Sequence, residues 1–281
     1  MADNLATPAT PSLEKSDRPS KGIVDPAGAA QRIRLARYKP SSALAPFVDY
    51  HWVVEWNLAD RPPETQRTLP YPCAHLVFEA GKTAVYGVVR GAFQRRGAGV
   101  GRILGIRFRP GGLRPFLDVP MQRLTGRTMS VTPLVGLTDA EAESMVLDAP
   151  GDRGMVAAAE ALFHDRLPAA DPMIDRIGSI IAIAERAGGP ARASELAEHA
   201  GMSLRALQRL FGDYVGVPPK WVIARFRLQE AAWRLAQGEE LNLSSLAIEL
   251  GYFDQAHLTR AFTRLVGQSP AEYQLTQRRG A

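Results

Sequence analysis

Two short stretches near the C-terminal end of the sequence carry side chains that can hydrogen-bond to the edges of nucleic-acid bases. Arginine can pair bidentately with guanine, glutamine can pair with adenine, and threonine offers a hydroxyl or a methyl group. The candidate base or phosphate contacts are Ser203, Arg205, Gln208 and Arg209 in the first stretch, and Gln255, His257, Thr259, Arg260 and Arg264 in the second. Arg209 and Arg260 hold equivalent places, so pairing with a scaffold carboxylate is the alternative role for one of them.

These side chains lie within a sequence pattern that occurs twice. Each copy has a Leu-Ala pair, a glycine, a Leu-x-Arg-x-Phe segment, and then a glycine and a proline. The first copy runs from Leu196 to Pro218, and the second runs from Leu246 to Pro270. Because each unit of a repeat is usually one supersecondary element, both copies should fold in the same way.

Each copy predicts two helices joined by a tight turn. Gly201 and Gly251 follow apolar-periodic runs, where glycine readily takes the left-handed conformation that ends a helix. Ser203 and Asp254 then stand as N-caps of the second helices, and Asn242 stands as the N-cap before the second copy. The alternative is an ordinary helical hairpin with no DNA role. Two copies with outward-facing polar residues favour the helix-turn-helix.

The segment between the copies predicts one long helix. It starts after Pro218-Pro219 and runs to about Ala236 with apolar residues at helical spacing. At 1.5 Å per residue, its length is roughly 27 Å. With the flanking turns, this helix would hold two recognition helices about one DNA turn apart, near 34 Å. One chain would then read two successive major-groove segments without dimerising.

This part of the sequence resembles the DNA-binding domain of the AraC/XylS family of bacterial transcription regulators. The match is densest at Gly251-Tyr252-x-Asp254-x-x-His257-Leu258, followed by Gly267-x-x-Pro270-x-x-Tyr273. The resemblance implies an all-α domain of seven helices over residues 171–277, with two motifs that enter adjacent major grooves of promoter DNA. It also implies RNA polymerase as a partner. Ala256 departs from the family, where a polar side chain often stands, and so removes one base contact.

The N-terminal part predicts a separate β-rich domain over residues 31–168. Several short strands separated by Pro/Gly turns are typical of a small antiparallel barrel or sandwich, here called cupin-like. The expected strands cover residues 50–56, 74–79, 83–89 and 102–108, and the expected helices cover 113–117, 139–147 and 152–167. The whole chain is therefore expected to be an α+β protein of two domains.

A second resemblance concerns this N-terminal domain. Leu104-Gly-Ile-Arg-Phe-Arg-Pro-Gly-Gly112 and the turn Pro70-Tyr-Pro-Cys73 resemble an uncharacterised amino-terminal domain found in a subset of AraC-type regulators. That turn usually reads Pro-Asp-Gly, so its Tyr and Pro depart from the pattern. In the wider family such domains bind a small effector or dimerise. The resemblance therefore implies a small-molecule effector and a homodimer as candidate partners.

The candidate effector-binding residues are Trp52, His75 and Glu79. In a strand, His75 and Glu79 would share a face. A cupin-type metal site needs a tighter pair of histidines, and His51 is the only other histidine nearby, so no bound metal is expected. A metal-dependent cupin enzyme with an accessory DNA-binding domain is the rival interpretation. Four larger aromatic residues of this half could line an apolar pocket or fill a core, and core is the preferred interpretation for any one of them: Trp52, Trp56, Tyr86 and Phe108.

Cys73 and the glycine-rich segment 97–101 are two further features with chemical potential. Cys73 is the single cysteine, which excludes an internal disulfide and favours a cytoplasmic protein. A buried structural thiol is expected, and the alternative is a repair protein that uses this thiol as an alkyl acceptor. The segment 97–101 precedes a strand instead of leading from a strand into a helix, so a hairpin turn is expected rather than a nucleotide site.

Composition agrees with a DNA-binding protein of two domains. The chain has 281 residues, 46% hydrophobic residues and a net charge of +5. This length can bury about two ordinary cores, and positive charge favours contact with DNA. No apolar run approaches the ~20 residues of a membrane span. Residues 1–30 read as a disordered leader. The sequence predicts a cytoplasmic transcription regulator, an activator by family resemblance, without cofactor or enzymatic activity.

Overall fold

A six-stranded antiparallel sheet organises the N-terminal half. The computed structural model describes residues 33–59, 61–186, 188–237 and 241–280. The predicted leader, residues 1–30, lies outside them. The strand order is β1-β2-β7-β4-β5-β8. These strands are β1 (Ile33–Tyr38), β2 (Val48–Leu58), β4 (His75–Phe78), β5 (Ala84–Tyr86), β7 (Gly99–Phe108) and β8 (Thr128–Met129).

A separate two-stranded ribbon faces one side of this sheet. It pairs β3 (Glu64–Thr68) with β6 (Phe93–Gly97) in antiparallel register. The described strands thus form two layers, and no pairing closes them into the barrel that was one of the two expectations. The predicted hairpin turn at residues 97–101 is also wrong. β6 pairs with β3 and β7 pairs with β2 and β4, so the turn around Gly99 carries the chain from one layer to the other.

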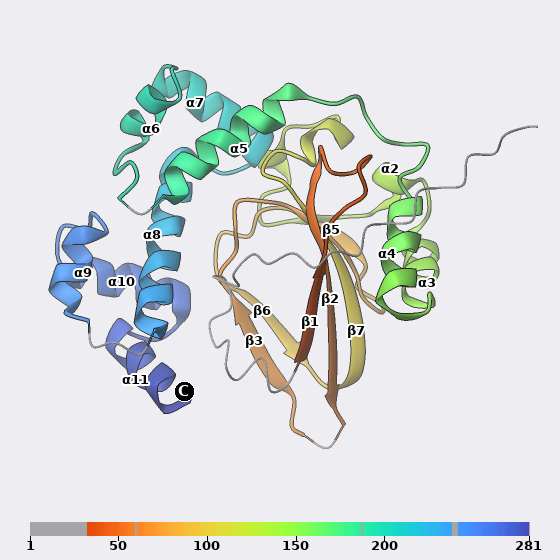
Figure 1. Ribbon diagram of the computed structural model, residues 1–281, viewed down its shortest axis with the longest axis horizontal. Coiled ribbons are helices and arrows are strands. Elements are labelled where there is room, and N and C mark those ends of the chain that lie inside the picture. Colours follow the sequence, from red (N-terminus) through yellow and green to blue (C-terminus); the bar gives the residue numbers. More distant parts are fainter. Residues whose placement is uncertain (1–32, 60, 187, 238–240, 281) are drawn as a thin grey trace, which may run out of the picture.

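Three helices cover the opposite face of the large sheet: α2 (Thr132–Val135), α3 (Asp139–Leu147) and α4 (Gly151–Ala161). Figure 1 shows them on the side of the sheet away from β3 and β6. The apolar side chains of this face, including Val53, Leu76 and Ile106, form the N-terminal core with the helices. His51 lies on this face too, where its Nε2 is 2.7 Å from an oxygen of Glu160.

The C-terminal half is helical and packs against the ribbon side of the sheet (Figure 1). Ten α-helices occur in the described residues, and seven of them follow Asp171. These seven are α5 (Pro172–Glu185), α6 (Ala193–His199), α7 (Leu204–Leu210), α8 (Pro219–Ala236), α9 (Leu243–Glu249), α10 (Gln255–Val266) and α11 (Pro270–Gly280). A π-helical turn, η3 (Phe211–Val215), extends α7. No helix in the described ranges is long and apolar enough to cross a membrane.

Two apolar cores hold these helices, and α8 contributes to both. One core joins the first half of α8 to α5, α6 and α7, and the other joins its second half to α9, α10 and α11. Each core also takes in a side chain from the sheet domain: Val88 lies in the first and Leu69 in the second. The two halves of the chain are therefore packed together.

Several sequence expectations about these elements are corrected. The expected helix at 113–117 is a single 3-10 turn, η1 (Arg114–Phe116), which ends because Leu117 is extended. The helix expected over 152–167 ends at Ala161 and gives way to turns. The strands β1, β3, β6 and β8 were not predicted. In contrast, the helix 139–147 and the helix from Pro219 to Ala236 are confirmed.

Candidate nucleic-acid interface and sheet pocket

The first helix-turn-helix comprises α6 and α7. Gly201 turns the chain between them with a φ of +63°, in the left-handed region that favours glycine. Ser203 caps α7, because its hydroxyl accepts the backbone N–H of Ala206 at 3.2 Å. Leu196 and Leu207 are buried in the contact between the two helices.

The second helix-turn-helix repeats this construction in α9 and α10. The side-chain oxygen of Asn242 accepts the backbone N–H groups of Ser244 and Ser245, both at 3.0 Å. Gly251 has a φ of +72°. Asp254 caps α10 by accepting the N–H of His257 at 2.7 Å. All three predicted caps and both glycine turns are therefore confirmed.

Most of the predicted DNA contacts are exposed on α7 and α10. The exposed members are Ser203, Arg205, Gln208, Arg209, Gln255, His257, Arg260 and Arg264, while Thr259 is half-buried. Within the described residues, no hydrogen bond or ion pair engages the guanidinium groups of the four arginines. The hydroxyl of Ser203 is already used as the cap. The alternative pairing of Arg209 or Arg260 with a scaffold carboxylate is not formed among the described residues.

Two of these side chains already contact neighbours in their own motif. A side-chain oxygen of Gln255 accepts the hydroxyl of Ser244 at 2.8 Å. The ring of His257 lies edge-on to that of Tyr252, with centroids 5.2 Å apart. These contacts hold both side chains at the N-terminal end of α10. Sequence reasoning did not single out Phe253, which stands immediately before the cap residue and is 86% exposed.

A pocket of about 310 Å³ lies between the large sheet and the ribbon. It is walled mainly by apolar and aromatic side chains from alternate positions of β1, β2 and β4 and from β3, β5 and β6. All three predicted effector-binding residues line it: Trp52, His75 and Glu79. Trp56 and Tyr86 line it too, so their interpretation as core is wrong, whereas Phe108 is fully buried in the core.

Two glycines of β7 make room for the tryptophan rings of β2. Trp52 is the register partner of Gly105, and Trp56 is the partner of Gly101. A Cβ atom built on Gly105 would lie 2.0 Å from the Trp52 ring, and one on Gly101 would lie 2.3 Å from the Trp56 ring. Each indole therefore lies directly over a glycine, which leaves planar π surface along one wall of the pocket.

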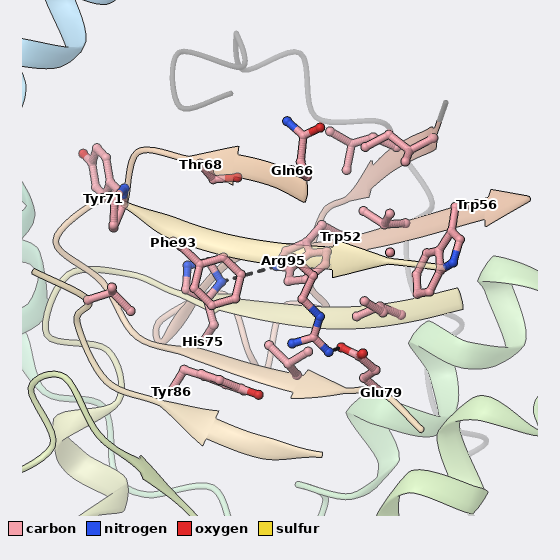
Figure 2. A pocket seen from close by; sticks show the side chains of 18 of the residues that line it. Trp52, Trp56, Gln66, Thr68, Tyr71, His75, Glu79, Tyr86, Phe93 and Arg95 are labelled. Atoms are coloured by element: carbon pink, nitrogen blue, oxygen red, sulfur yellow. Dashed lines mark hydrogen bonds and ion pairs between the residues drawn. The ribbon is translucent and has the colours of Figure 1, made fainter. Parts of the chain in front are cut away.

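The polar groups of the pocket come from opposite walls. Arg95 of β6 reaches the carboxylate of Glu79 next to β4 and forms an ion pair (Figure 2). The indole Nε1 of Trp52 donates to His75 Nδ1 at 3.3 Å, and His75 Nε2 lies 3.5 Å from the thiol of Cys73. Burial, assisted by the charge of Arg107, lowers the pKa of His75 to about 3, so its imidazole is neutral.

The surroundings of His75 and Cys73 bear on the two rival interpretations, a metal-dependent cupin enzyme and a repair protein that uses Cys73 as an alkyl acceptor. His75 Nδ1 accepts the indole N–H of Trp52, and Nε2 faces the thiol of Cys73. The described residues contain no cluster of three or more metal-ligating side chains. Cys73 is buried, and burial raises the pKa of its thiol, which disfavours the nucleophilic thiolate that alkyl transfer needs.

The ribbon side of the pocket is also the contact with the helical half. Gln66 and Thr68 of β3 line the pocket, while Arg67 between them points to α10 and donates to the carbonyl of Val266 at 3.0 Å. Its guanidinium occupies the space over Gly267, where a Cβ would lie 2.0 Å from Nη1. β3 thus has one face on the pocket and the other on the C-terminal end of a predicted recognition helix.

The segment after β3 continues this contact. The amide of Gln229 on α8 donates to the carbonyls of Leu69 and Pro70, at 3.4 and 3.2 Å. Tyr71 lines the pocket, its ring is 5.3 Å from that of Phe226, and its hydroxyl donates to Glu185 at 2.9 Å. Pro70 and Tyr71 belong to the turn Pro70–Cys73, in which Tyr71 and Pro72 depart from the family pattern.

Two parts of the chain match known domain families. Residues 36–130 match a domain of unknown function (DUF6597), and residues 196–276 match a helix-turn-helix domain.

Three relatives are named as regulators. An uncharacterized HTH-type transcriptional regulator of Haemophilus influenzae is 32% identical over 95 residues, which cover 34% of this chain and 32% of that protein. The HTH-type transcriptional regulator Rv1931c of Mycobacterium tuberculosis is 36% identical over 88 residues, covering 31% and 34%. The RCS-specific HTH-type transcriptional activator RclR of Escherichia coli is 33% identical over 99 residues, covering 35% and 34%. The match spans about a third of the length of each relative.

Two solved structures are also similar. An AraC-type regulator from Chromobacterium violaceum is 22% identical, with a TM-score of 0.31, and the match covers 36% of this chain and 88% of that one. ToxT from Vibrio cholerae is 10% identical, with a TM-score of 0.37, and the match covers 88% and 98%. These scores are too low to carry a conclusion about this chain. The family matches show that the chain carries a DUF6597 domain over residues 36–130, followed by a helix-turn-helix domain over residues 196–276.

Proposed function

We propose that the chain is a sequence-specific transcription regulator whose helices α7 and α10 enter two adjacent major-groove segments of promoter DNA. The observation that carries this proposal is the repeated geometry of the two motifs. In both, a glycine turn and a side-chain cap start a helix whose first turns expose arginines, and those arginines have no partner among the described residues. Such a helix N-terminal half is the part that contacts bases in helix-turn-helix proteins.

The long helix α8 supports the two-segment arrangement. It has 18 residues, which corresponds to roughly 27 Å, and each of its halves is buried in a different helix-turn-helix core. Because each half of α8 is packed in one of these cores, α8 holds the recognition helices α7 and α10 at a fixed distance and orientation. A fixed separation near one helical turn of DNA, about 34 Å, lets a single chain read both segments.

The sheet pocket supports the second part of the proposal, regulation by a small effector. A ligand can regulate DNA binding only if it binds one domain arrangement better than another. β3 and the turn after it form a pocket wall and contact α8 and α10. A ligand that displaces this wall would therefore change the contacts that position the second helix-turn-helix.

The remaining parts of the proposal come from likeness to named relatives. RclR of Escherichia coli is named a transcriptional activator. By this likeness we extend the proposal to activation, which requires contact with RNA polymerase, and to a cytoplasmic protein acting on the chromosome. The proposed regulator is not an enzyme. A homodimer stays a prediction, since two motifs on one rod suffice to read both segments.

The test uses a duplex selected from a random-sequence library by the purified full-length chain. The double variant Arg205→Ala/Arg260→Ala removes one candidate base contact from each motif. If each contributes about 1–3 kcal/mol, affinity for the selected duplex should fall at least roughly thirtyfold.

The matched control is Arg61→Ala/Arg153→Ala, which removes two exposed arginines of the sheet domain. This variant should bind like the wild type, and circular dichroism should show that both variants are folded. Equal affinity of the two double variants would contradict the assignment of Arg205 and Arg260 to DNA.

A further inference from the structure

We infer that the sheet pocket takes an uncharged, planar aromatic ligand that carries a hydrogen-bond donor and an acceptor side by side. This inference deepens the proposed effector role by naming the chemical class of the ligand. It rests on the proposed function only for the consequence of binding, because binding itself can be measured without DNA.

The first argument is the shape and chemistry of the walls. Trp52 and Trp56 lie over Gly105 and Gly101, and Phe93 and Tyr86 lie across from each other with ring centroids 6.3 Å apart. Aromatic rings pair favourably with other rings in stacked or edge-to-face geometry, in addition to the gain from buried area. The surrounding wall is aliphatic and includes Ile33, Leu35, Val54 and Ile103.

The second argument is the size of the space. The cavity of about 310 Å³ lies at the lower end of the usual range for small-molecule sites. It suits a small ligand, such as one of about two fused rings with a small substituent.

The third argument is the ion pair between Glu79 and Arg95, which sets the charge that the ligand can carry. The side chains of Arg95 and Glu79 are 24% and 11% exposed. A ligand carboxylate would have to compete with Glu79 for Arg95, and a ligand cation would have to compete with Arg95 for Glu79. A ligand carboxylate on Arg95 would leave Glu79 only the exposed Lys82, whose Nζ is 3.8 Å away, and a ligand cation on Glu79 would leave the half-buried guanidinium of Arg95 uncompensated. Both outcomes are unfavourable.

An uncharged amide or similar group avoids this cost. Its carbonyl can accept from Arg95 while its N–H donates to Glu79, so the protein ion pair stays intact. The neutral imidazole of His75 adds no positive charge to the site. Two more arginines, Arg37 and Arg96, also line the pocket. Arg96 is exposed, so solvent screens its attraction for an anion.

The experiment is an isothermal titration of the full-length chain with three matched probes. The first is 2-naphthamide, which is planar and uncharged. The second is 2-naphthoate, which has the same rings but is an anion. The third is decahydronaphthalene-2-carboxamide, which has the same amide on a saturated frame. We expect 2-naphthamide to bind about tenfold more tightly than either of the others, since it alone keeps both the ring contacts and the ion pair.

A pair of tryptophan variants locates the binding. Trp56→Leu should weaken 2-naphthamide binding about tenfold. The matched control is Trp233→Leu on α8, which changes a tryptophan that is 41% exposed and does not line the pocket. It should leave the affinity unchanged. Equal affinities for the two variants would overturn the placement of the ligand in the pocket.

Other outcomes also decide the inference. Tighter binding of 2-naphthoate, equal binding of the saturated amide, or no binding of any probe would overturn the ligand class. DNA affinity is measured separately on the selected duplex. If the chain binds the duplex but none of the probes, the ligand inference is wrong and the proposal that the chain reads DNA stands. If the chain binds 2-naphthamide in the pocket but no selected duplex, the ligand inference stands and the proposed function is wrong.

Discussion

Replacing Gly105 by alanine should destabilise the sheet domain by displacing Trp52. The new Cβ would lie 2.0 Å from the indole, so the ring has to leave its place over β7. Overpacking of this kind typically costs about 1–3 kcal/mol. The bond from the indole Nε1 to His75, now 3.3 Å, would be lost as well and adds about 0.5–1.5 kcal/mol. The free energy of unfolding should therefore fall by about 1.5–4.5 kcal/mol.

The assay is urea unfolding followed by tryptophan fluorescence and circular dichroism. The matched control is Gly91→Ala, since a Cβ there meets no atom within 4 Å. The control should stay within about 0.5 kcal/mol of the wild type. The pocket geometry would be refuted if Gly105→Ala unfolded at the same urea concentration as Gly91→Ala. The same variant should also lose affinity for 2-naphthamide, because one aromatic wall is displaced.

Three further predictions test other contacts. Hydrogen bonds from Arg34 lower the pKa of Asp152 in the folded chain. The ionised carboxylate therefore stabilises the folded state at any pH above the pKa that Asp152 has in the unfolded chain. This stabilisation is lost as the pH falls through the lower pKa of the folded chain. The difference in urea midpoint between the wild type and Asp152→Asn should accordingly shrink from about pH 6 to about pH 2, and a constant difference would exclude the ion pair as its source. Burial raises the pKa of Cys73, so the native thiol should react with Ellman's reagent at least about tenfold more slowly than the unfolded chain does; equal rates would show an accessible thiol. Arg67→Met removes the hydrogen bond to the carbonyl of Val266, and amide hydrogen exchange in the last turn of α10 should speed up about tenfold, whereas unchanged exchange would mean that the sheet domain does not hold this helix end.

The C-terminal half was predictable because its signals are local. Ser203, Asn242 and Asp254 cap the helices that follow them, and Gly201 and Gly251 turn where the sequence placed them. Caps and glycine turns depend on a few neighbouring residues, so their pattern in the sequence is specific. The start of α8 at a proline is a signal of the same kind.

The N-terminal half was less predictable because its contacts are distant in sequence. The strand Glu64–Thr68 reads Glu-Thr-Gln-Arg-Thr, and the strand Phe93–Gly97 is also mostly polar, so neither shows alternating hydrophobicity. The polar residues of these strands make contacts that only the fold brings together. Arg67 donates a hydrogen bond to the carbonyl of Val266 on α10, and Arg95 forms an ion pair with Glu79.

The pairing of each tryptophan of β2 with a glycine of β7 also depends on strand register, which no local pattern encodes. Trp56 was therefore interpreted as core, although it lines the pocket.

The most direct test of the central claim is a methylation-protection footprint of the full-length chain on its selected duplex. Two recognition helices on one rigid helix predict two protected major-groove segments about one helical turn, 10–10.5 base pairs, apart for each bound chain. Arg205→Ala should weaken protection of one segment and Arg260→Ala that of the other. A single protected segment per chain, equally sensitive to both variants, would contradict the reading of DNA by both motifs.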